Sequence, residues 1–120
     1  MFTKTDIIAK AWLLKETVNL VLQEEGLSVE RIFLCGSYAS GKANSRSDID
    51  FIVQLDKKVY PKDIWMSLQE INAKINDRTV HVIFGTESAA KSLKDKNEGK
   101  IKSYDYEEVN LSSVQPQGAA

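Results

Sequence analysis

Residues 36–50 read GSYASGKANSRSDID, and this polar stretch decides the fold because an apolar run lies on either side of it. Residues 32–35 (IFLC) precede it and residues 51–53 (FIV) follow it, so we expect two buried strands joined by a loop. Successive side chains of a strand point to opposite faces. Asp48 and Asp50 therefore point the same way at the start of the second strand, and the apolar residues between and after them point the other way.

The paired aspartates and the turn before them suggest binding of a phosphorylated ligand. Neighbouring carboxylates repel each other unless a cation lies between them, and oxygen ligands of this kind suit Mg²⁺, with Mn²⁺ as the alternative. Gly36 and Ser37 directly follow the first strand. A turn of small residues leaves backbone N–H groups available for phosphate oxygens, above all where a helix begins. The other interpretations are a helix N-cap at Ser37 and a solvated strand edge at the aspartates.

Composition narrows the function classes. The chain has 120 residues, 42% of them hydrophobic, which is enough for one domain with its own core. The net charge of −1 argues against a protein that binds along nucleic acid, although Lys42 and Arg46 form a local basic pair that suits phosphate or solvent. The single cysteine, Cys35, is expected in the core. No signal peptide or long apolar span is recognisable, so we expect a cytoplasmic protein without membrane contact.

Hydrophobic periodicity predicts the order helix, strand, loop, strand, helix, strand, helix. A capping box at Thr3 and Asp6 opens the first helix, Gly26 ends it, and Pro61 suits the first turn of the second helix. The other expected elements are strands over residues 29–35, 48–55 and 79–84, a helical turn or tight loop over 40–43, a charged helix over 88–96, an ambiguous segment over 101–111 and a disordered tail over 112–120. This order predicts an α/β (α+β) domain over residues 1–111, with a small mixed sheet and helices packed on one face.

The motif spacing resembles that of the DNA polymerase β-like nucleotidyltransferase superfamily, and most closely its minimal nucleotidyltransferases. Gly36 and Ser37 are followed, after ten residues, by the Asp48 and Asp50 pair, and both motifs adjoin apolar strands. The resemblance covers roughly residues 5–105. It implies the nucleotidyltransferase fold, phosphate contacts from Gly36 and Ser37, and metal ligation by Asp48 and Asp50.

The resemblance also implies an activity and its partners. The activity is Mg²⁺-dependent transfer of a nucleoside monophosphate, AMP from ATP or its equivalent from another NTP, to an unknown acceptor. Minimal nucleotidyltransferases often act as antitoxins that modify a HEPN-type helical partner protein, which makes such a partner one candidate acceptor. A homo-oligomer is left open. Nucleic acid is not an expected partner, since the chain is not basic.

One position departs from the family pattern. The superfamily usually carries a third carboxylate on the later strand, and the pattern of residues 79–84 puts His81 there. An imidazole binds Mg²⁺ poorly, because that ion prefers oxygen, while Asp77 lies four residues earlier at the start of the strand. His81 is thus a candidate catalytic residue or a structural strand histidine. Weaker catalysis, a different metal preference and no catalysis all stay open; the alternative function is a nucleotide- or partner-binding regulatory or antitoxin module.

Overall fold

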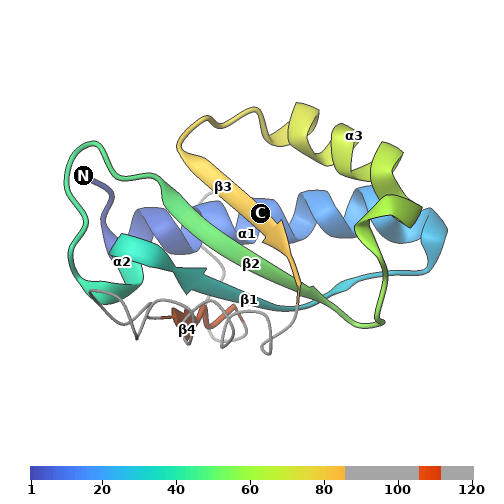
Figure 1. Cartoon of the computed structure of the whole chain (residues 1–120), viewed down its shortest axis with the longest axis horizontal. Helices are drawn as coiled ribbons and strands as arrows, with labels where there is room; N and C mark the ends of the chain where they lie inside the picture. The colour runs from blue at the N-terminus through green and yellow to red at the C-terminus, as the bar shows by residue number, and fades with distance from the viewer. Residues whose placement is uncertain (86–105, 112–120) are drawn as a thin grey trace.

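A mixed β-sheet is the framework of the fold. The computed structural model describes residues 1–85 and 106–111, and in this part of the chain the sheet has the strand order β3-β2-β1-β4. The pairing is antiparallel between β1 and β2 and between β1 and β4, and parallel between β2 and β3. The strands are β1 (Val29–Cys35), β2 (Ile49–Leu55), β3 (Val80–Phe84) and β4 (Tyr106–Glu108) (Figure 1). The predicted mixed sheet is confirmed.

The first helix begins where the capping box predicts. α1 (Lys4–Leu22) follows Thr3, whose hydroxyl accepts a hydrogen bond from the Asp6 N–H at 3.1 Å, while the Asp6 carboxylate accepts the Thr3 N–H at 2.8 Å. A 3₁₀ turn, η1 (Gln23–Glu25), leads to Gly26, whose φ of 70° ends the helix. The apolar positions that predict the helix are all buried: Ile7, Ala11, Leu14, Val18, Val21 and Leu22.

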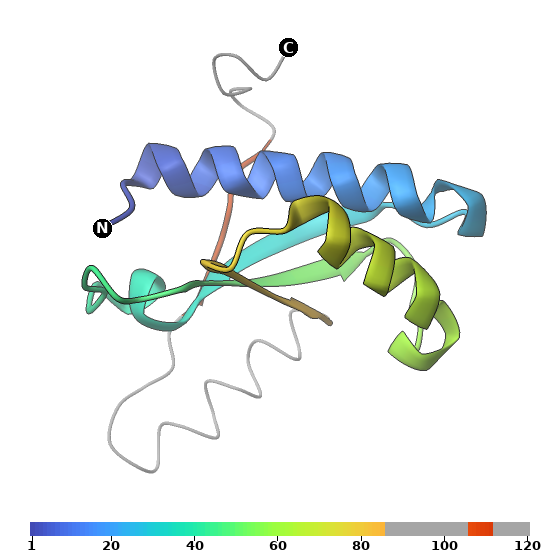
Figure 2. The same cartoon turned by 90° about the horizontal axis from the view of Figure 1, so that it is seen from above.

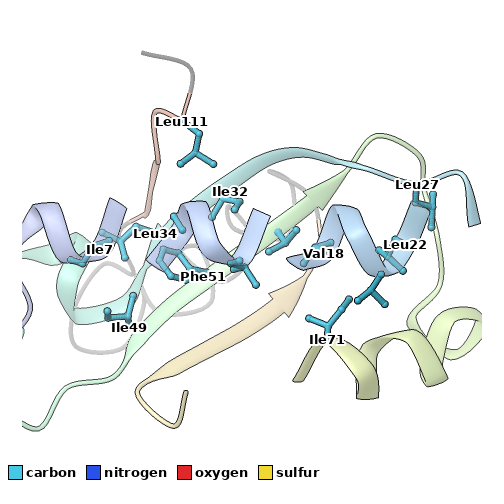
Figure 3. Packing of buried hydrophobic residues seen from close by; sticks show 14 of the residues in the cluster. Ile7, Val18, Leu22, Leu27, Ile32, Leu34, Ile49, Phe51, Ile71 and Leu111 are labelled. Carbon is cyan, nitrogen blue, oxygen red and sulfur yellow. The ribbon is translucent and has the colours of Figure 1, made fainter. Parts of the chain in front are cut away.

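A second helical segment packs beside α1. It opens with a 3₁₀ turn, η2 (Pro61–Ile64), continues as α3 (Trp65–Ile75) and ends at Asn76, which adopts the left-handed conformation. Both α1 and α3 lie on the same side of the sheet (Figure 2). Their apolar side chains meet those of β1 and β2 in one buried cluster, in which Val18, Leu22, Phe51 and Ile71 are at most 2% exposed (Figure 3). The predicted placement of the helices on one face is confirmed.

A short helix forms earlier than the sequence suggests. Of the two alternatives for residues 40–43, the helical turn is wrong and the loop is confirmed for 41–43, because α2 (Gly36–Ser40) begins directly at the end of β1 and ends at Ser40. Gly36 makes this possible: its φ of +69° turns the chain sharply out of the strand. Gly41, with φ of +75°, ends the helix after five residues. The Gly36 turn and the loop after α2 therefore lie at one end of β1 (Figure 1).

The remaining expectations meet the structure only in part. Within the ambiguous segment 101–111, the described residues include β4, so this part is extended and pairs with β1. The expected helix over 88–96 and the tail 112–120 lie outside the described residues. No helix among the described residues is long and apolar enough to cross a membrane.

Candidate active site

Asp50 lies at the centre of a row of residues that crosses the sheet. Strand register places Cys35 of β1 opposite Asp50, and Asp50 beside His81 of β3; Tyr106 of β4 continues the row beyond Cys35. Ile49 and Phe51, the neighbours of Asp50 in β2, point into the core under the helices. Asp50 and His81 therefore project from the face of the sheet opposite α1 and α3, which we call the site face; the side under α1 and α3 is the helical face.

The Asp50 carboxylate touches the turn at Gly36. A Cβ atom added to Gly36 would lie 2.4 Å from Asp50 Oδ2, closer than any side chain tolerates. The positive φ at Gly36 and this contact both require glycine at position 36. Two motifs that the sequence separates by ten residues, the small-residue turn and the aspartate pair, are in direct contact here.

Burial makes the Asp50 carboxylate a costly charge. It raises the pKa of Asp50 above its ordinary value of 3.8, and the nearby charge of Asp48 adds to the increase, whereas His81 acts in the opposite direction. The Asp50 side chain is 30% exposed, so a ligand can still reach it. A cation bound here would offset the negative charges of both Asp48 and Asp50.

Cys35 is part of the same row and lies in the protein interior. Its side chain is buried, and burial, together with the Asp50 carboxylate, raises its thiol pKa to about 12. A raised thiol pKa favours the protonated form, as is usual for a buried structural cysteine. The interpretation of Cys35 as a small core residue is confirmed.

His81 faces Asp50, which the sequence could not establish. Its Nδ1 lies 3.4 Å from Asp50 Oδ1, and its side chain is 70% exposed. The parallel pairing of β2 and β3 brings the two together, since Asp50 and His81 are register partners. The structure therefore places His81 beside Asp50, the second residue of the aspartate pair.

Asp77, the other acidic residue considered for the third position, is engaged elsewhere. Its Oδ2 accepts a hydrogen bond from Lys10 Nζ of α1 at 2.5 Å, and its Oδ1 accepts from the N–H and the hydroxyl of Thr79 at 2.9 and 2.6 Å. These partners, Lys10 first, lower the pKa of Asp77 to about 2. These contacts hold the start of β3 against α1, and both carboxylate oxygens of Asp77 take part in them.

The loop between α2 and β2 carries Asp48 and the basic pair. Asn44 and Ser47 close a turn in this loop: the Asn44 N–H donates to Ser47 Oγ at 2.9 Å, and the Ser47 N–H donates to the Asn44 carbonyl at 3.1 Å. Asp48 follows this turn and is exposed just before β2. Lys42 and Arg46 are also exposed in the loop. The structure thus brings Gly36, Asp50 and His81 together and leaves the basic pair on the surface.

Ser37 is the second residue of α2 and not its cap. The N-cap is Cys35, so the alternative interpretation of Ser37 as an N-cap is wrong. The Ser37 carbonyl accepts hydrogen bonds from the Lys42 N–H at 2.9 Å and from the Ser40 hydroxyl at 3.2 Å. Ser37 lies in the first turn of the helix, where backbone N–H groups have no partner within the helix.

The donors at the site fit a divalent cation only in part. Among the described residues, no three His, Cys, Asp or Glu side chains gather closely enough to form a ready metal site. Asp50 and His81 offer an oxygen and a nitrogen 3.4 Å apart, and the elevated pKa of Asp50 marks a carboxylate without full compensation. Two donors are in place, and the exposed Asp48 is close enough to raise the pKa of Asp50. This donor set suits a cation that is bound by one or two carboxylates and keeps several water molecules as its remaining ligands.

Two features of the site are not evident from the sequence. One is the commitment of Asp77 to Lys10, residues 67 positions apart in the chain. The other is the contact between Gly36 and Asp50, which depends on the antiparallel register of β1 and β2. A glycine at the end of an apolar strand is a signal for a close backbone approach, but it does not name the group that approaches.

The sequence of the chain matches a known protein family. The sequence profile of a family described as the nucleotidyltransferase domain matches residues 14–109, which is most of the chain, and the protein belongs to this family. The predicted class is thereby confirmed. No curated protein matches significantly.

Two solved structures bear a loose likeness to the chain. One is a crystal structure of a toxin-antitoxin with AMP-PNP, at 15% sequence identity and a TM-score of 0.43. The other is a mutant of the toxin-antitoxin MntA-HpeT, at 13% identity and a TM-score of 0.42. In each case 80% of this chain and 72% of the other chain are covered.

Proposed function

We propose that the protein is a minimal, metal-dependent nucleotidyltransferase that transfers AMP from ATP to an acceptor on a partner protein. The observation that carries this proposal is the contact between Gly36 and the Asp50 carboxylate, which joins a turn of phosphate-binding type to an acidic residue with an elevated pKa. Membership of the nucleotidyltransferase domain family supports the reaction type. The helical partner and the choice of ATP follow from the sequence resemblance to minimal nucleotidyltransferases.

In this proposal the residues of the site have separate tasks. The backbone at Gly36 and Ser37 binds the β- and γ-phosphates, and Lys42 and Arg46 offset the triphosphate charge from the loop. Asp48 and Asp50 hold the divalent cation, which when bound neutralises the triphosphate and acidifies an acceptor hydroxyl. The acceptor oxygen bonds to the α-phosphorus, the bond from that phosphorus to pyrophosphate breaks, and the hydroxyl proton leaves to solvent. The protein mainly positions these groups.

The first experiment measures metal-dependent nucleotide binding by calorimetry. We expect the full chain to bind ATP with Mg²⁺ or Mn²⁺ and to lose binding with EDTA. The double variant Asp48→Asn/Asp50→Asn should bind at least about tenfold more weakly, the order expected when metal ligands are lost. Asp63→Asn, the same chemical change at an exposed position in η2, is the matched control and should bind like the parent protein.

Folding of the double variant is a necessary control. Because burial raises the pKa of Asp50, its ionised form opposes folding at neutral pH, and the neutral amide of Asn removes that cost. We therefore expect the double variant to unfold in urea at the same concentration as the parent or a higher one. ATP binding that is equal in the double variant, or indifferent to EDTA, would disprove the proposal.

Three observations favour a second function, that of a partner-binding module without catalysis. The described residues contain no group of three His, Cys, Asp or Glu side chains that could hold a metal ion. His81, which the resemblance aligns with the third carboxylate, is the register partner of Asp50. Trp65 and Met66 at the start of α3 are 59% and 79% exposed, which is unusual for large apolar side chains and typical of protein interfaces. Partner binding that survives Asp48→Asn/Asp50→Asn but is lost in Trp65→Ala would favour this function.

A further inference from the structure

The short helix α2 carries the Gly36 turn, and its own backbone does not fix its orientation. The helix has five residues, and a helix of this length is not stable by itself in water. Gly36 begins it with a φ of +69°, and Gly41 ends it with a φ of +75°. The orientation of α2, and with it the contact between Gly36 and the Asp50 carboxylate, therefore depends on contacts with the rest of the protein.

Tyr38 is the one large side chain of α2, whose other residues are glycine, serine and alanine. It is partly buried against the hydrophobic core that α1 covers. Its hydroxyl accepts a hydrogen bond from the Phe2 N–H at 3.1 Å. The centroids of the Tyr38 and Phe2 rings are 6.2 Å apart, with the rings tilted by 52°, which is a favourable arrangement for an aromatic pair. Tyr38 thus connects α2 to the residues just before α1.

Phe2 is itself held in place by α1. The Lys10 ammonium lies 5.0 Å from the centroid of the Phe2 ring, within the range of a cation–π interaction. Phe2 also directly precedes Thr3, whose capping box with Asp6 fixes the direction of the chain at this point. The partner of Tyr38 is therefore an anchored residue, 36 positions away in the chain.

The contact that α2 makes with Asp50 tolerates little displacement. A Cβ atom at Gly36 would already lie 2.4 Å from Asp50 Oδ2, so the backbone of the turn and the carboxylate are closely fitted. Tyr38 follows Gly36 by two residues in the same helical turn, and a shift of its side chain would move the backbone at Gly36. The hydrogen bond to Phe2 opposes such a shift.

We propose that Tyr38 is a positioning residue of the candidate active site: through its hydrogen bond and ring contact with Phe2, it holds the Gly36 turn in the orientation that binds phosphate. This inference rests on the proposed function, since it takes the Gly36 turn as the phosphate contact. It deepens that function by naming the two residues, outside the motif pair of Gly36 and Asp50, that keep the turn in place.

The test measures ligand affinity in matched variants of the full chain. Calorimetry should show that Tyr38→Phe, which keeps the ring and removes the acceptor oxygen, binds ATP with Mg²⁺ about two- to tenfold more weakly than the parent protein, the range that one lost hydrogen bond produces. Phe2→Ala should weaken binding to a similar extent, and Phe2→Tyr, which keeps a ring and the N–H, should bind like the parent. Tyr60→Phe, the same change at a 59% exposed position, is the matched control and should leave the affinity unchanged.

A ligand without a base separates phosphate positioning from recognition of adenine. Inorganic triphosphate should lose affinity for Tyr38→Phe by the same factor as ATP, because the Gly36 turn contacts phosphates in the proposed function. A loss that affects ATP alone would overturn the inference, since Tyr38 would then act on the base or the sugar.

Hydrogen exchange reports on α2 in the absence of ligand. The Lys42 N–H donates to the Ser37 carbonyl at 2.9 Å, so its exchange rate follows the order of α2. Phe2→Ala, although remote in sequence, should speed exchange at Lys42 and leave exchange at the buried Ile71 of α3 unchanged. If Tyr38 has a structural role only, its variant lowers the urea midpoint of unfolding and leaves both ligand affinities at the parent values.

The outcomes separate the inference from the proposed function. Unchanged affinities in Tyr38→Phe and Phe2→Ala overturn the inference; if ATP binding still depends on Asp48 and Asp50, the proposed function survives. Weakened binding with unchanged exchange at Lys42 also overturns the inference, because the effect would not pass through α2. Absence of ATP binding in the parent protein overturns both. Weaker binding of both ligands, together with faster exchange at Lys42, supports the inference.

Discussion

Both faces of the sheet hold buried apolar side chains, but the site face also carries the Asp50 carboxylate. On the helical face, Ile49, Phe51 and Val53 of β2 are fully buried against α1 and α3. Asp50, the residue after Ile49, points to the site face. Its carboxylate contacts Gly36 and His81 there. The site face of β2 therefore holds both a buried apolar residue, Ile52, and a residue whose charge opposes folding, Asp50.

This difference separates stability from function along a single strand. Phe51 contributes its apolar area to the core, whereas Asp50 has an elevated pKa because burial disfavours its ionised form. A carboxylate that lowers stability is retained where ligand binding offsets the loss, and such residues concentrate at functional sites. Substitutions of Phe51 and its neighbours in the helical-face core should thus change the free energy of unfolding, and substitutions of Asp50 or of Gly36 beside it should change ligand binding.

The largest effect is expected on the helical face. Phe51→Ala should lower the free energy of unfolding by about 3–5 kcal/mol, because it leaves a cavity between the sheet and α1. Ile83→Ala, at a 46% exposed position of β3, should cost less than about 1 kcal/mol. Urea unfolding of both variants measures the contrast. Equal losses would mean that the two faces do not differ in their contribution to stability.

A smaller effect on stability, with a complete effect on binding, is expected at Gly36. Gly36→Ala and Gly41→Ala both force a side chain into positive φ, which costs about 1–2 kcal/mol in each case. Only at position 36 would the new Cβ collide with Asp50; at position 41 nothing lies within 4 Å. We therefore expect ATP binding to be lost in Gly36→Ala and kept in Gly41→Ala, as calorimetry would detect. Loss of binding in both variants would assign the effect to backbone strain alone.

The smallest effect is expected at Asp77. Like residues of the helical face, this carboxylate should contribute to the free energy of unfolding and not to ATP binding. Its pKa is lowered to about 2, so its interaction with Lys10 and Thr79 stabilises the fold above the ordinary pKa of 3.8 and is lost as the pH falls from about 4 to about 2. Because the side chain is 27% exposed, solvent screening reduces the gain to about 1 kcal/mol. Asp77→Asn should lose this amount at pH 7, and the difference from the parent should vanish near pH 2.

Urea unfolding at both pH values, with ATP binding at pH 7, checks this prediction. ATP binding should stay unchanged in Asp77→Asn, in contrast to the double variant Asp48→Asn/Asp50→Asn. In Lys10→Met the effect of Asp77→Asn should become smaller, since the ion pair is already gone. Weakened ATP binding in Asp77→Asn would contradict its assignment to the helical side and return it to the site.

Much of the fold was predictable because its signals are local. The capping box at Thr3 and the apolar spacing of α1 act within one or two helical turns, and the structure confirms both. The limits of β1 were likewise predicted correctly from its apolar run. The start of α2 was missed, because a helix of five residues has no periodic signal and depends on the turn at Gly36.

The candidate site was predictable in its residues but not in its contacts. The spacing of Gly36, Ser37, Asp48 and Asp50 already indicated the family that the profile match confirms. The catalytic and binding roles of these residues, and of Lys42, Arg46 and His81, stay predictions. The position of His81 beside Asp50 needed the register of two strands that are not adjacent in sequence. The engagement of Asp77 required α1 to be packed against the start of β3.

The sequence by itself determined the two longer helices α1 and α3, the strands β1, β2 and β3, and the class of protein, because periodicity, capping and motif spacing are properties of neighbouring residues. Only the tertiary structure decided which groups meet. It put Asp50 against Gly36 and beside an imidazole, and it bound Asp77 to Lys10 instead. The physical reason is that pKa values, metal preference and steric limits depend on distances of a few ångströms between distant segments, and these are fixed only when the strands pair and the helices pack.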